Sequence, residues 1–420
     1  MVWLLVFMPI ALLVLGVPIF VILAVTSMVV LIFGDIPGTI MHQNMFGGVS
    51  IFSLMAVPFF IFAGELMGRG GMSKRLIAWA LSILGGIRGS LPLTTVGTST
   101  VFGAISGSSP ATVAGVGRLL YPPLRDKGYS EKFSSGVITS SGAIAIVIPP
   151  SIAMILYGVS AEEDIAKLFI AGILPGLLMA FAMGIYIYIY ARIKGIKESE
   201  GFSLTKLVIT TKEGVWALGS PFIILGGIYS GIFSPTESGG VACVYAILVT
   251  RYIYRDISWH GIWEVAQSSA YLTAQVLIIV AAASVFSWLL TVNGIPQAVA
   301  SYIGDIKAEP WVILLAINVF LLIVGCVLDP NSAILVLTPL LAPIVQAMGV
   351  DLIHFGIIIT VNLAIGMFTP PFGLNIFVAQ AVLNAPLKSI YPGLIAFIFI
   401  NIGVLMVVTY VPELSLVLTR

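Results

Sequence analysis

The sequence predicts an all-α integral membrane protein with two inverted repeats, each holding a re-entrant helical hairpin and a helix broken in mid-membrane. Three observations predict this fold: the composition, the lengths of the apolar segments and an internal repeat. Of the 420 residues, 59% are hydrophobic and 9% are charged, whereas about 25% of the residues of a soluble globular protein are charged. So few charges cannot cover a soluble surface of this size, so most of the surface is expected to face lipid.

Charge and cysteine content exclude several classes of function. The 19 basic and 18 acidic residues give a net charge of +1, whereas nucleic-acid-binding domains carry a clustered basic face, so we expect no nucleic-acid partner. Cys243 and Cys326 lie inside apolar runs and indicate neither a disulfide framework nor a thiolate metal cluster. The sequence has no Walker A pattern, so we expect neither ATP nor another organic cofactor to be used by this chain.

Several apolar segments are long enough to cross a hydrocarbon core of about 30 Å. The segment 1–33 is almost wholly apolar, has no basic residue before it and shows no clear cleavage site. It is therefore expected to be one retained spanning helix rather than a signal peptide. The other predicted spans cover 49–67, 133–157, 168–190, 214–233, 239–254, 265–291, 353–382 and 389–412.

The basic residues predict which ends of these spans face the cytoplasm, because Lys and Arg collect in short cytoplasmic loops. The loop 34–48 has no basic residue, and the acidic loop 162–164 is followed only by Lys167, so both loops are expected outside. With the N-terminus inside, every basic cluster is cytoplasmic provided that two segments, 90–117 and 310–345, do not cross. The basic clusters lie at 69–75, 118–132, 192–212 and 251–255.

These two segments are predicted to be re-entrant hairpins. Each has apolar limbs of about 13 to 17 residues around a polar break, and at about 1.5 Å per residue such a segment reaches the bilayer midplane and returns. The polar breaks lie at 106–110 and 329–332. The segments before them, 74–88 and 295–307, are expected to be helices lying along the interface.

An internal repeat supports this arrangement. A shift of 221 positions, the separation of Pro149 from Pro370, places the pair Pro149-Pro150 on Pro370-Pro371 without a gap. Five predicted crossings lie between the starts of the two broken helices, and this odd number makes the second copy inverted. Hairpin 90–117 then enters from the cytoplasm and hairpin 310–345 from outside. The same shift superposes Leu119 on Leu340, Leu120 on Leu341, Pro122 on Pro343, Gly128 on Gly349, Ile138 on Ile359 and Thr139 on Thr360.

The predicted domain organisation follows from the spans and the repeat. Scaffold helices form the N-terminal part and the middle of the chain, and a charged cytoplasmic linker is expected at 191–213. Each repeat contains an interfacial arm, a hairpin and a broken helix. The boundaries are 1–67 for the N-terminal scaffold, 68–167 for the first repeat, 168–264 for the second scaffold part, 265–388 for the inverted repeat and 389–420 for the C-terminal helix.

The two breaks predict cation sites. A helix interrupted in mid-membrane frees backbone groups that lipid cannot satisfy, so the break persists only beside a buried or watery site. Proline pairs create such breaks because they lack N–H donors and clash with the preceding turn. Sodium is held by several neutral oxygens in broken-helix transporters, so two facing oxygen cages and two or more sodium ions are expected. The oxygens come from Ser106, Ser108, Ser109, Thr112, Ala145 and Ile148 at the first break, and from Gly325, Asn331, Ser332, Gly366 and Thr369 at the second.

The same breaks create helix N-termini, whose partial positive charge and free amides suit an anionic substrate. Gly and Ser in membrane helices most often serve close packing, but packing alone does not require the register between the two copies. Asp329 is either a functional acid at midplane depth or a cap of the hairpin break, and both interpretations remain open. Glu237 is expected to cap a helix. The predicted substrate-binding residues are Ser108, Pro110, Thr112, Asp329, Asn331, Asn362 and Asn375.

An intramembrane serine hydrolase is a weaker alternative. The run 107–111, Gly-Ser-Ser-Pro-Ala, has some similarity to a serine elbow, but its final glycine is missing and no histidine is evident within reach.

The sequence resembles the large membrane subunit of a tripartite ATP-independent periplasmic (TRAP) transporter over nearly the whole chain. The segments that carry the resemblance are Ala56-Val57-Pro58-Phe59-Phe60, Ala63-Gly64-Glu65-Leu66-Met67, the hairpin 106–115, Ile148-Pro149-Pro150-Ser151, the run 226–233 leading into Pro235-Thr236-Glu237, and Thr369-Pro370-Pro371. Each of these motifs is weak alone, and together they are specific.

The resemblance implies a multi-pass protein of the bacterial inner membrane that imports a small organic anion, such as a dicarboxylate, sialic acid or another carboxylate, by a sodium-driven elevator mechanism. It also implies a periplasmic substrate-binding protein and a small four-helix membrane subunit as partners, beside the surrounding lipid. No small-subunit helices precede this N-terminus, so that subunit is expected as a separate chain. An ion-coupled anion transporter without a binding protein is the alternative.

The resemblance also assigns sodium ligands. The first sodium site of the family maps onto Ser106, Ser109, Ile148 and Pro149, and the second maps onto Gly325, Gly366 and Thr369.

Overall fold

The computed structural model describes residues 2–196, 201–305 and 309–420. Within these ranges the regular structure consists of α-helices, two short 3₁₀ turns and one π-helical turn, without a strand. The predicted all-α class is therefore confirmed.

The N-terminal apolar segment differs from the prediction. The expected single spanning helix 1–33 is wrong, because the chain forms two antiparallel-packed pieces, α1 (Val2–Val14) and α2 (Ile19–Phe33), that contact each other. The turn between them contains Gly16 with φ of 75° and Pro18, which precedes α2. Glycine tolerates this left-handed φ and proline cannot continue a helix, so apolar composition alone did not reveal the turn.

The first half continues through a hairpin and a broken helix. After α3 (Thr39–Val49), the 3₁₀ turn Phe52–Met55 and α4 (Ala56–Arg69), the chain forms α5 (Met72–Leu84), α6 (Ser90–Ser106) and α7 (Ser109–Asp126). Helices α6 and α7 pack as the expected helical hairpin, turning at Gly107. Helix α8 (Glu131–Ser141) then passes through a 3₁₀ turn (Gly142–Ile146) and stops before Pro149-Pro150, and α9 (Ile152–Ala161) follows, which confirms the predicted interruption.

The middle of the chain contains longer helices. Helix α10 (Ile165–Ile193) and helix α11 (Leu204–Tyr229) both extend into the predicted linker 191–213, so that linker is shorter than expected, and its residues 197–200 lie outside the described ranges. Helix α12 (Pro235–Ile247) continues as a π-helical turn (Leu248–Ile253). The Ser234 side chain and Glu237 form a capping box at the start of α12, which confirms the capping interpretation of Glu237.

The second half repeats the helix order of the first. Helix α7 begins at Ser109 and α16 at Pro330, and α8 begins at Glu131 and α17 at Leu352, so both pairs are 221 positions apart. The second interruption falls between α17 and α18, at Pro370-Pro371, as predicted. The helices of this half are α13 (Trp259–Val292), α14 (Ile295–Asp305), α15 (Pro310–Gly325), α16 (Pro330–Ala347), α17 (Leu352–Gly366), α18 (Leu374–Leu383), α19 (Leu387–Tyr410) and α20 (Glu413–Leu416).

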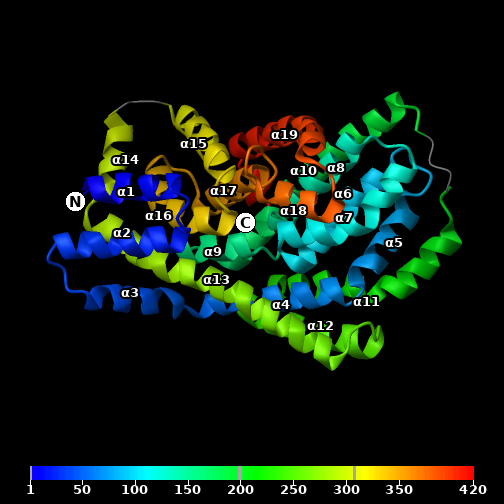
Figure 1. Ribbon diagram of the computed structural model, residues 1–420, viewed down its shortest axis with the longest axis horizontal. Helices are drawn as coiled ribbons and strands as arrows, with labels where there is room; N and C mark the ends of the chain where they lie inside the picture. The colour runs from blue at the N-terminus through cyan, green and yellow to red at the C-terminus, as the bar shows by residue number, and fades with distance from the viewer. Residues whose placement is uncertain (1, 197–200, 306–308) are drawn as a thin grey trace.

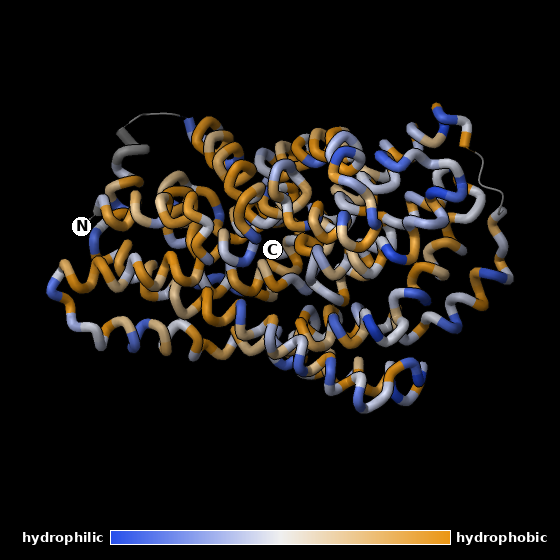
Figure 2. Tube along the Cα trace, in the orientation of Figure 1, coloured by the Kyte–Doolittle hydropathy of each residue, from blue (hydrophilic) through white to orange (hydrophobic). Residues whose placement is uncertain are grey.

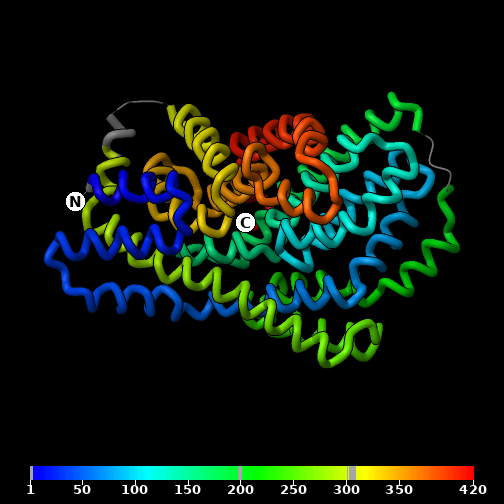
Figure 3. Tube along the Cα trace, viewed as in Figure 1, coloured from blue at the N-terminus to red at the C-terminus, as the bar shows by residue number. Residues whose placement is uncertain are grey.

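The two halves exchange contacts at their centre. Helix α9 packs against α16, and helix α18 packs against α7, so the distal half of each broken helix lies on the hairpin of the other half. Figure 3 shows the two hairpins reaching the centre from opposite ends of the molecule, with α6 and α7 at the right and α15 and α16 at the left. Helix α13 runs beside α2, α3 and α4 along one side of this core (Figure 1).

Five helices within the described ranges are long and apolar enough to cross a membrane, judged by length and composition alone. Figure 2 shows apolar residues along most of the helices, with hydrophilic residues more frequent in the right half of the view. Helices of this apolar character are expected in a membrane protein. The five segments are Phe52–Arg69, Ile165–Ile193, Trp259–Val292, Pro330–Ala347 and Leu387–Tyr410.

Glycines allow α8 and α19 to meet backbone to backbone. A Cβ atom built on Gly393 would lie 1.9 Å from the carbonyl oxygen of Lys132, and one built on Gly136 would lie 2.2 Å from the carbonyl oxygen of Gly393. Small residues permit this close approach of membrane helices.

Gly393→Ala should separate these helices and lower stability, since overpacking costs about 1–3 kcal/mol. The midpoint of thermal unfolding of the detergent-purified protein is expected to fall by several degrees. Gly403→Ala in the same helix is the control, because nothing lies within 4 Å of a Cβ built there. Equal midpoints for the two variants would contradict the close crossing.

Candidate functional site

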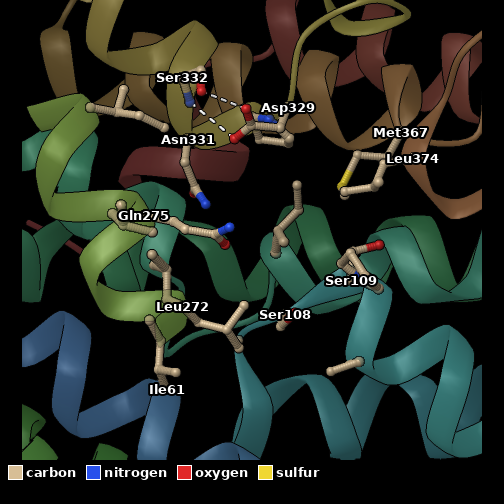
Figure 4. A pocket seen from close by; sticks show the side chains of 18 of the residues that line it. Ile61, Ser108, Ser109, Leu272, Gln275, Asp329, Asn331, Ser332, Met367 and Leu374 are labelled. Atoms are coloured by element: carbon tan, nitrogen blue, oxygen red, sulfur yellow. Dashed lines mark hydrogen bonds between the residues drawn. The ribbon is translucent and has the colours of Figure 1, made fainter. Parts of the chain in front are cut away.

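A cavity of about 500 Å³ lies where the tips of the two hairpins meet the two helix interruptions (Figure 4). The tip of α6–α7 and the tip of α15–α16 both line it, together with parts of α4 and α13. The structure therefore brings together predicted site residues that are more than 200 positions apart in the sequence. The predicted residues that line the cavity are Ser106, Ser108, Ser109, Pro110, Asp329, Asn331 and Ser332.

The turn of the first hairpin lies directly against the first interruption. Gly107 has φ of 57°, and a Cβ atom built on it would lie 2.7 Å from the carbonyl oxygen of Pro150. A Cβ built on Gly103 would lie 2.5 Å from the Cα atom of Ala145. The segments that carry Ser106, Ser109, Ala145, Ile148 and Pro149, which are the predicted first sodium ligands, are therefore in backbone contact.

Hydroxyl groups stabilise this turn from within. The Ser108 backbone N–H donates to Ser106 Oγ (3.3 Å), and the Thr112 hydroxyl donates to the Ser108 carbonyl oxygen (2.8 Å). Thr112 Oγ1 also lies 3.3 Å from Ser106 Oγ. Thr112 is fully buried and does not line the cavity. Thr112 thus supports the hairpin turn from outside the cavity lining, and its substrate contact stays a prediction.

The second set of predicted ligands is also brought together. A Cβ atom built on Gly366 would lie 2.4 Å from the carbonyl carbon of Gly325 and 2.6 Å from its oxygen. The Thr369 backbone N–H donates to the Gly366 carbonyl oxygen (3.1 Å), and the Thr369 hydroxyl donates to the Ile365 carbonyl oxygen (2.7 Å). The hydroxyl proton of Thr369 is thereby used inside its own segment, and its oxygen lone pairs are left as acceptors.

The two hairpin tips differ in how their second helices begin. At the start of α16 the Asp329 carboxylate accepts from the Ser332 backbone N–H (3.1 Å) and from the Ser332 hydroxyl. At the start of α7 Ser108 makes no capping bond with its side chain. The first N–H groups of a helix have no partner inside the helix, and those of Ser109 and Ala111 belong to cavity-lining residues.

This difference sets the electrostatics of the cavity. A helix N-terminus carries about half a positive elementary charge, which the Asp329 carboxylate offsets at α16, whereas Ser108 provides no side-chain cap at the start of α7. An anionic group is therefore favoured at the tip of the first hairpin. Of the two roles left open for Asp329, the geometry supports the cap.

The sequence model of the family described as "Tripartite ATP-independent periplasmic transporter, DctM component" matches residues 5–414. The chain belongs to this family. The TRAP large permease is accordingly a multi-pass membrane protein, and its relatives are transporter permeases rather than enzymes.

Three relatives illustrate the range of the family. The chain is 40% identical to the isethionate TRAP transporter permease protein DctMQ of Oleidesulfovibrio alaskensis over 96% of this chain and 64% of that protein, so it spans about two thirds of that relative. It is 39% identical to the C4-dicarboxylate TRAP transporter large permease protein DctM of Pseudomonas aeruginosa, covering 87% of this chain and 86% of that protein. It is also 39% identical to the ectoine TRAP transporter large permease protein TeaC of Halomonas elongata, covering 97% of this chain and 96% of that protein.

Solved structures share the fold. The YdaH transporter of Alcanivorax borkumensis superposes with a TM-score of 0.58 at 14% identity over 88% of this chain and 86% of that chain. MtrF of Neisseria gonorrhoeae superposes with a TM-score of 0.54 at 12% identity over 90% of this chain and 84% of that chain. At these identities the similarity concerns the fold alone.

Two further predicted substrate residues of the TRAP large permease, Asn362 and Asn375, do not line the cavity. Asn362 is buried between helices, where its amide nitrogen donates to Asn318 Oδ1 (2.8 Å) and to the Ile358 carbonyl oxygen (3.0 Å). Asn318 in turn donates to Thr409 Oγ1 (3.0 Å), so the network joins α15, α17 and α19. Asn375 is also fully buried, and its side chain contacts Ser109.

Two polar residues at the cavity were not predicted as site residues. Gln275 of α13 points into the cavity beside Asn331 (Figure 4). The sequence feature that could have identified Gln275 is a polar amide side chain in the middle of an apolar span. Glu65 of α4 also lines the cavity, and it pairs with Arg69 at 3.5 Å. The face that each helix turns to the cavity depends on packing, which the sequence pattern did not resolve.

The polar groups that line the TRAP permease cavity are hydroxyls, side-chain amides and two carboxylates. The carboxylate of Glu65 pairs with Arg69, and that of Asp329 caps α16. Among the described residues, no group of three or more His, Cys, Asp or Glu side chains could hold a metal ion, and no histidine lines the cavity. Ser109 contacts the Asn375 amide, whereas the serine of a serine hydrolase is activated by a neighbouring base.

Asp329→Asn should keep most of the stability of α16, because asparagine also caps a helix through its side-chain oxygen, whereas Asp329→Ala should lose about 1 kcal/mol. The expected result is a lower thermal unfolding midpoint for the alanine variant than for the asparagine variant. If both variants melt like the wild type, Asp329 does not act as the cap.

Proposed function

We propose that this TRAP large permease is a sodium-coupled secondary active importer of a small organic anion, such as a dicarboxylate, sialic acid or another carboxylate. It receives the anion from a periplasmic binding protein and carries it by an elevator mechanism. The observation that carries this proposal is the convergence of two hairpin tips and two interrupted helices on one cavity with neutral oxygens.

Sodium coupling is supported by the oxygens at the two interruptions. Carbonyl groups at a helix break in a membrane protein need partners that lipid does not supply. The first oxygen set lies where the Gly107 turn contacts Pro150, and the second lies where Gly325 contacts Gly366. Both sets match the neutral oxygen ligands that broken-helix transporters offer to sodium.

Anion binding is supported by the uncapped start of α7. The N–H groups of Ser109 and Ala111 and the Ser108 hydroxyl can donate to a carboxylate in the cavity. The side-chain amides of Asn331 and Gln275 line the opposite part of the same cavity. We place the charged group of the substrate at the first hairpin and its polar remainder between these amides.

An elevator built from inverted repeats is supported by the recurrence of helix boundaries at a shift of 221 positions and by the opposed directions of the hairpins (Figure 3). The limbs α6 and α15 have 17 and 16 residues, or about 24–26 Å, which is shorter than the hydrocarbon core of about 30 Å. Helix α9 packs on α16 and helix α18 packs on α7, and we assign the two hairpins and the two interrupted helices to the mobile domain. Helices α2, α3, α4 and α13 run beside it as the scaffold.

The partners are proposed from the family. The fused relative named DctMQ is longer than this chain, which covers 64% of it. We propose that the permease lies in the bacterial inner membrane and works with a small four-helix membrane subunit and a periplasmic binding protein. The names of the relatives include isethionate, C4-dicarboxylate and ectoine, so they do not point to one substrate.

The test is uptake by proteoliposomes that contain the permease and its small subunit, with the binding protein added outside. The radiolabelled probe is whichever of isethionate, succinate and ectoine the binding protein retains. Ser106→Ala combined with Thr369→Ala should raise the half-saturating sodium concentration by about tenfold or more, since a polar contact with a charged group contributes about 1.5–3 kcal/mol.

The matched control is Ser140→Ala combined with Thr360→Ala. These hydroxyls are fully buried and donate to carbonyl groups of their own helices, Gly136 and Gly356, at 2.8 Å and 2.7 Å. Unchanged sodium affinity in the Ser106 and Thr369 variant would contradict the cages. Uptake that proceeds without the binding protein would favour the alternative, an ion-coupled anion transporter that acts alone.

A further inference from the structure

A buried side-chain amide joins the two halves of the molecule beside the cavity. Asn375 lies in the first turn of α18, and its side chain is fully buried. Its amide nitrogen donates to Ser109 Oγ (2.7 Å) on α7 and to the Thr139 carbonyl oxygen (3.1 Å) on α8, and its amide oxygen lies 3.0 Å from the same Ser109 oxygen. These contacts span 266 and 236 positions of the sequence.

The backbone of Asn375 is hydrogen-bonded to the second interruption. Its N–H donates to the Met367 carbonyl oxygen (2.9 Å), and Met367 directly follows Gly366 at the end of α17. One residue therefore holds a carbonyl group of the second interruption with its backbone and the Ser109 hydroxyl of the first oxygen set with its side chain.

The hydrogen-bonded contact between Asn375 and Ser109 has no counterpart at the corresponding positions of the other half. At the shift of 221 positions, Asn375 corresponds to Met154 and Ser109 corresponds to Pro330. A thioether is at most a weak acceptor, and proline has neither a polar side chain nor an N–H group. The equivalent contact in the other half therefore cannot form a hydrogen bond between these side chains, and close packing of the repeat does not by itself explain the amide.

We propose that Asn375 is a positioning residue that couples the two sodium sites, because it fixes the Ser109 hydroxyl of the first site from the backbone of the second interruption. This inference rests on the proposed sodium function and adds to it a coupling between the two sodium sites. Asn375 is not one of the proposed sodium ligands and does not line the cavity, so this role differs from the substrate contact predicted from the sequence.

The chemistry of the hydroxyl explains the coupling. A serine hydroxyl has one proton and two lone pairs. With the Asn375 oxygen accepting the proton and the amide nitrogen donating to one lone pair, the second lone pair of Ser109 is held in a fixed direction for a cation. Without the amide, the hydroxyl can rotate toward a neighbouring carbonyl group and turn its lone pairs away from the site.

Sodium at the second site orders the carbonyl groups of the interruption, including that of Met367, and so holds Asn375 in place. By linkage, if the second ion raises the affinity of the first site, the first ion raises the affinity of the second by the same factor. The two ions should therefore bind cooperatively, and the loss of the amide should abolish this cooperativity.

The experiment measures the rate of uptake as a function of sodium for the wild type and for Asn375→Leu, in the proteoliposomes described above. The wild type is expected to show a Hill coefficient of about two, and the variant a coefficient of about one with a half-saturating sodium concentration raised about 5- to 10-fold, the range of typical coupling between sites. A merely structural role would lower the rate without changing the Hill coefficient.

Asn401→Leu is the matched control. Asn401 is equally buried in α19, but its amide nitrogen donates only to the Phe397 carbonyl oxygen of its own helix (2.8 Å). Its sodium curve should match that of the wild type. If Asn375→Leu does not fold, Asn375→Ala removes both the amide donor and the amide acceptor without adding bulk or charge, and it should show the same loss.

The outcomes separate this inference from the proposed function. Sodium-dependent uptake with an unchanged Hill coefficient and affinity in Asn375→Leu overturns the coupling and leaves sodium transport intact. A wild-type Hill coefficient of one does the same. Uptake that does not depend on sodium in the wild type overturns the proposed function, and the coupling with it.

Discussion

Backbone polar groups that a helix cannot pair, placed where lipid cannot pair them either, are the constraint on which this structure depends. The proline pairs at 149–150 and 370–371 interrupt two helices in the centre of the molecule. Glycines bring the hairpin backbones close enough to contact these interruptions. The Asn375 N–H donates to the Met367 carbonyl oxygen, which is one of the acceptors at the second interruption. The hairpin tips and residues on either side of both interruptions line one cavity, so the same constraint that shapes the fold also positions the site.

The two halves resemble each other in helix order but differ in chemistry. The second hairpin carries its own carboxylate cap, Asp329, whereas the first hairpin begins α7 without a side-chain cap. Only one half provides the amide tie from Asn375 to Ser109. A symmetric frame therefore supports an asymmetric site, in which one hairpin favours an anion and the other is electrostatically balanced. In the proposed function, this asymmetry would let the protein bind an anionic solute and cations side by side.

Much of this frame could be predicted from the sequence, because proline pairs, polar breaks and a constant shift of 221 positions are local or periodic signals. Both hairpins and both interruptions lie where these signals put them. The turn between α1 and α2 escaped prediction because apolar composition conceals a single Gly-Val-Pro turn. Gln275 and Glu65 at the cavity, and Asn362 away from it, depended on which face each helix buries, and that is decided by contacts between distant segments.

The most direct test of the two oxygen cages is a crystal structure of the permease in which thallium(I) replaces sodium, with the ions located by anomalous scattering. We expect one peak between the Ser106–Ser109 turn and the first interruption, and a second peak between Gly325 and the Gly366–Thr369 segment. Both peaks should vanish when excess sodium competes. Anomalous density that avoids both interruptions, while the protein still binds thallium, would contradict the account.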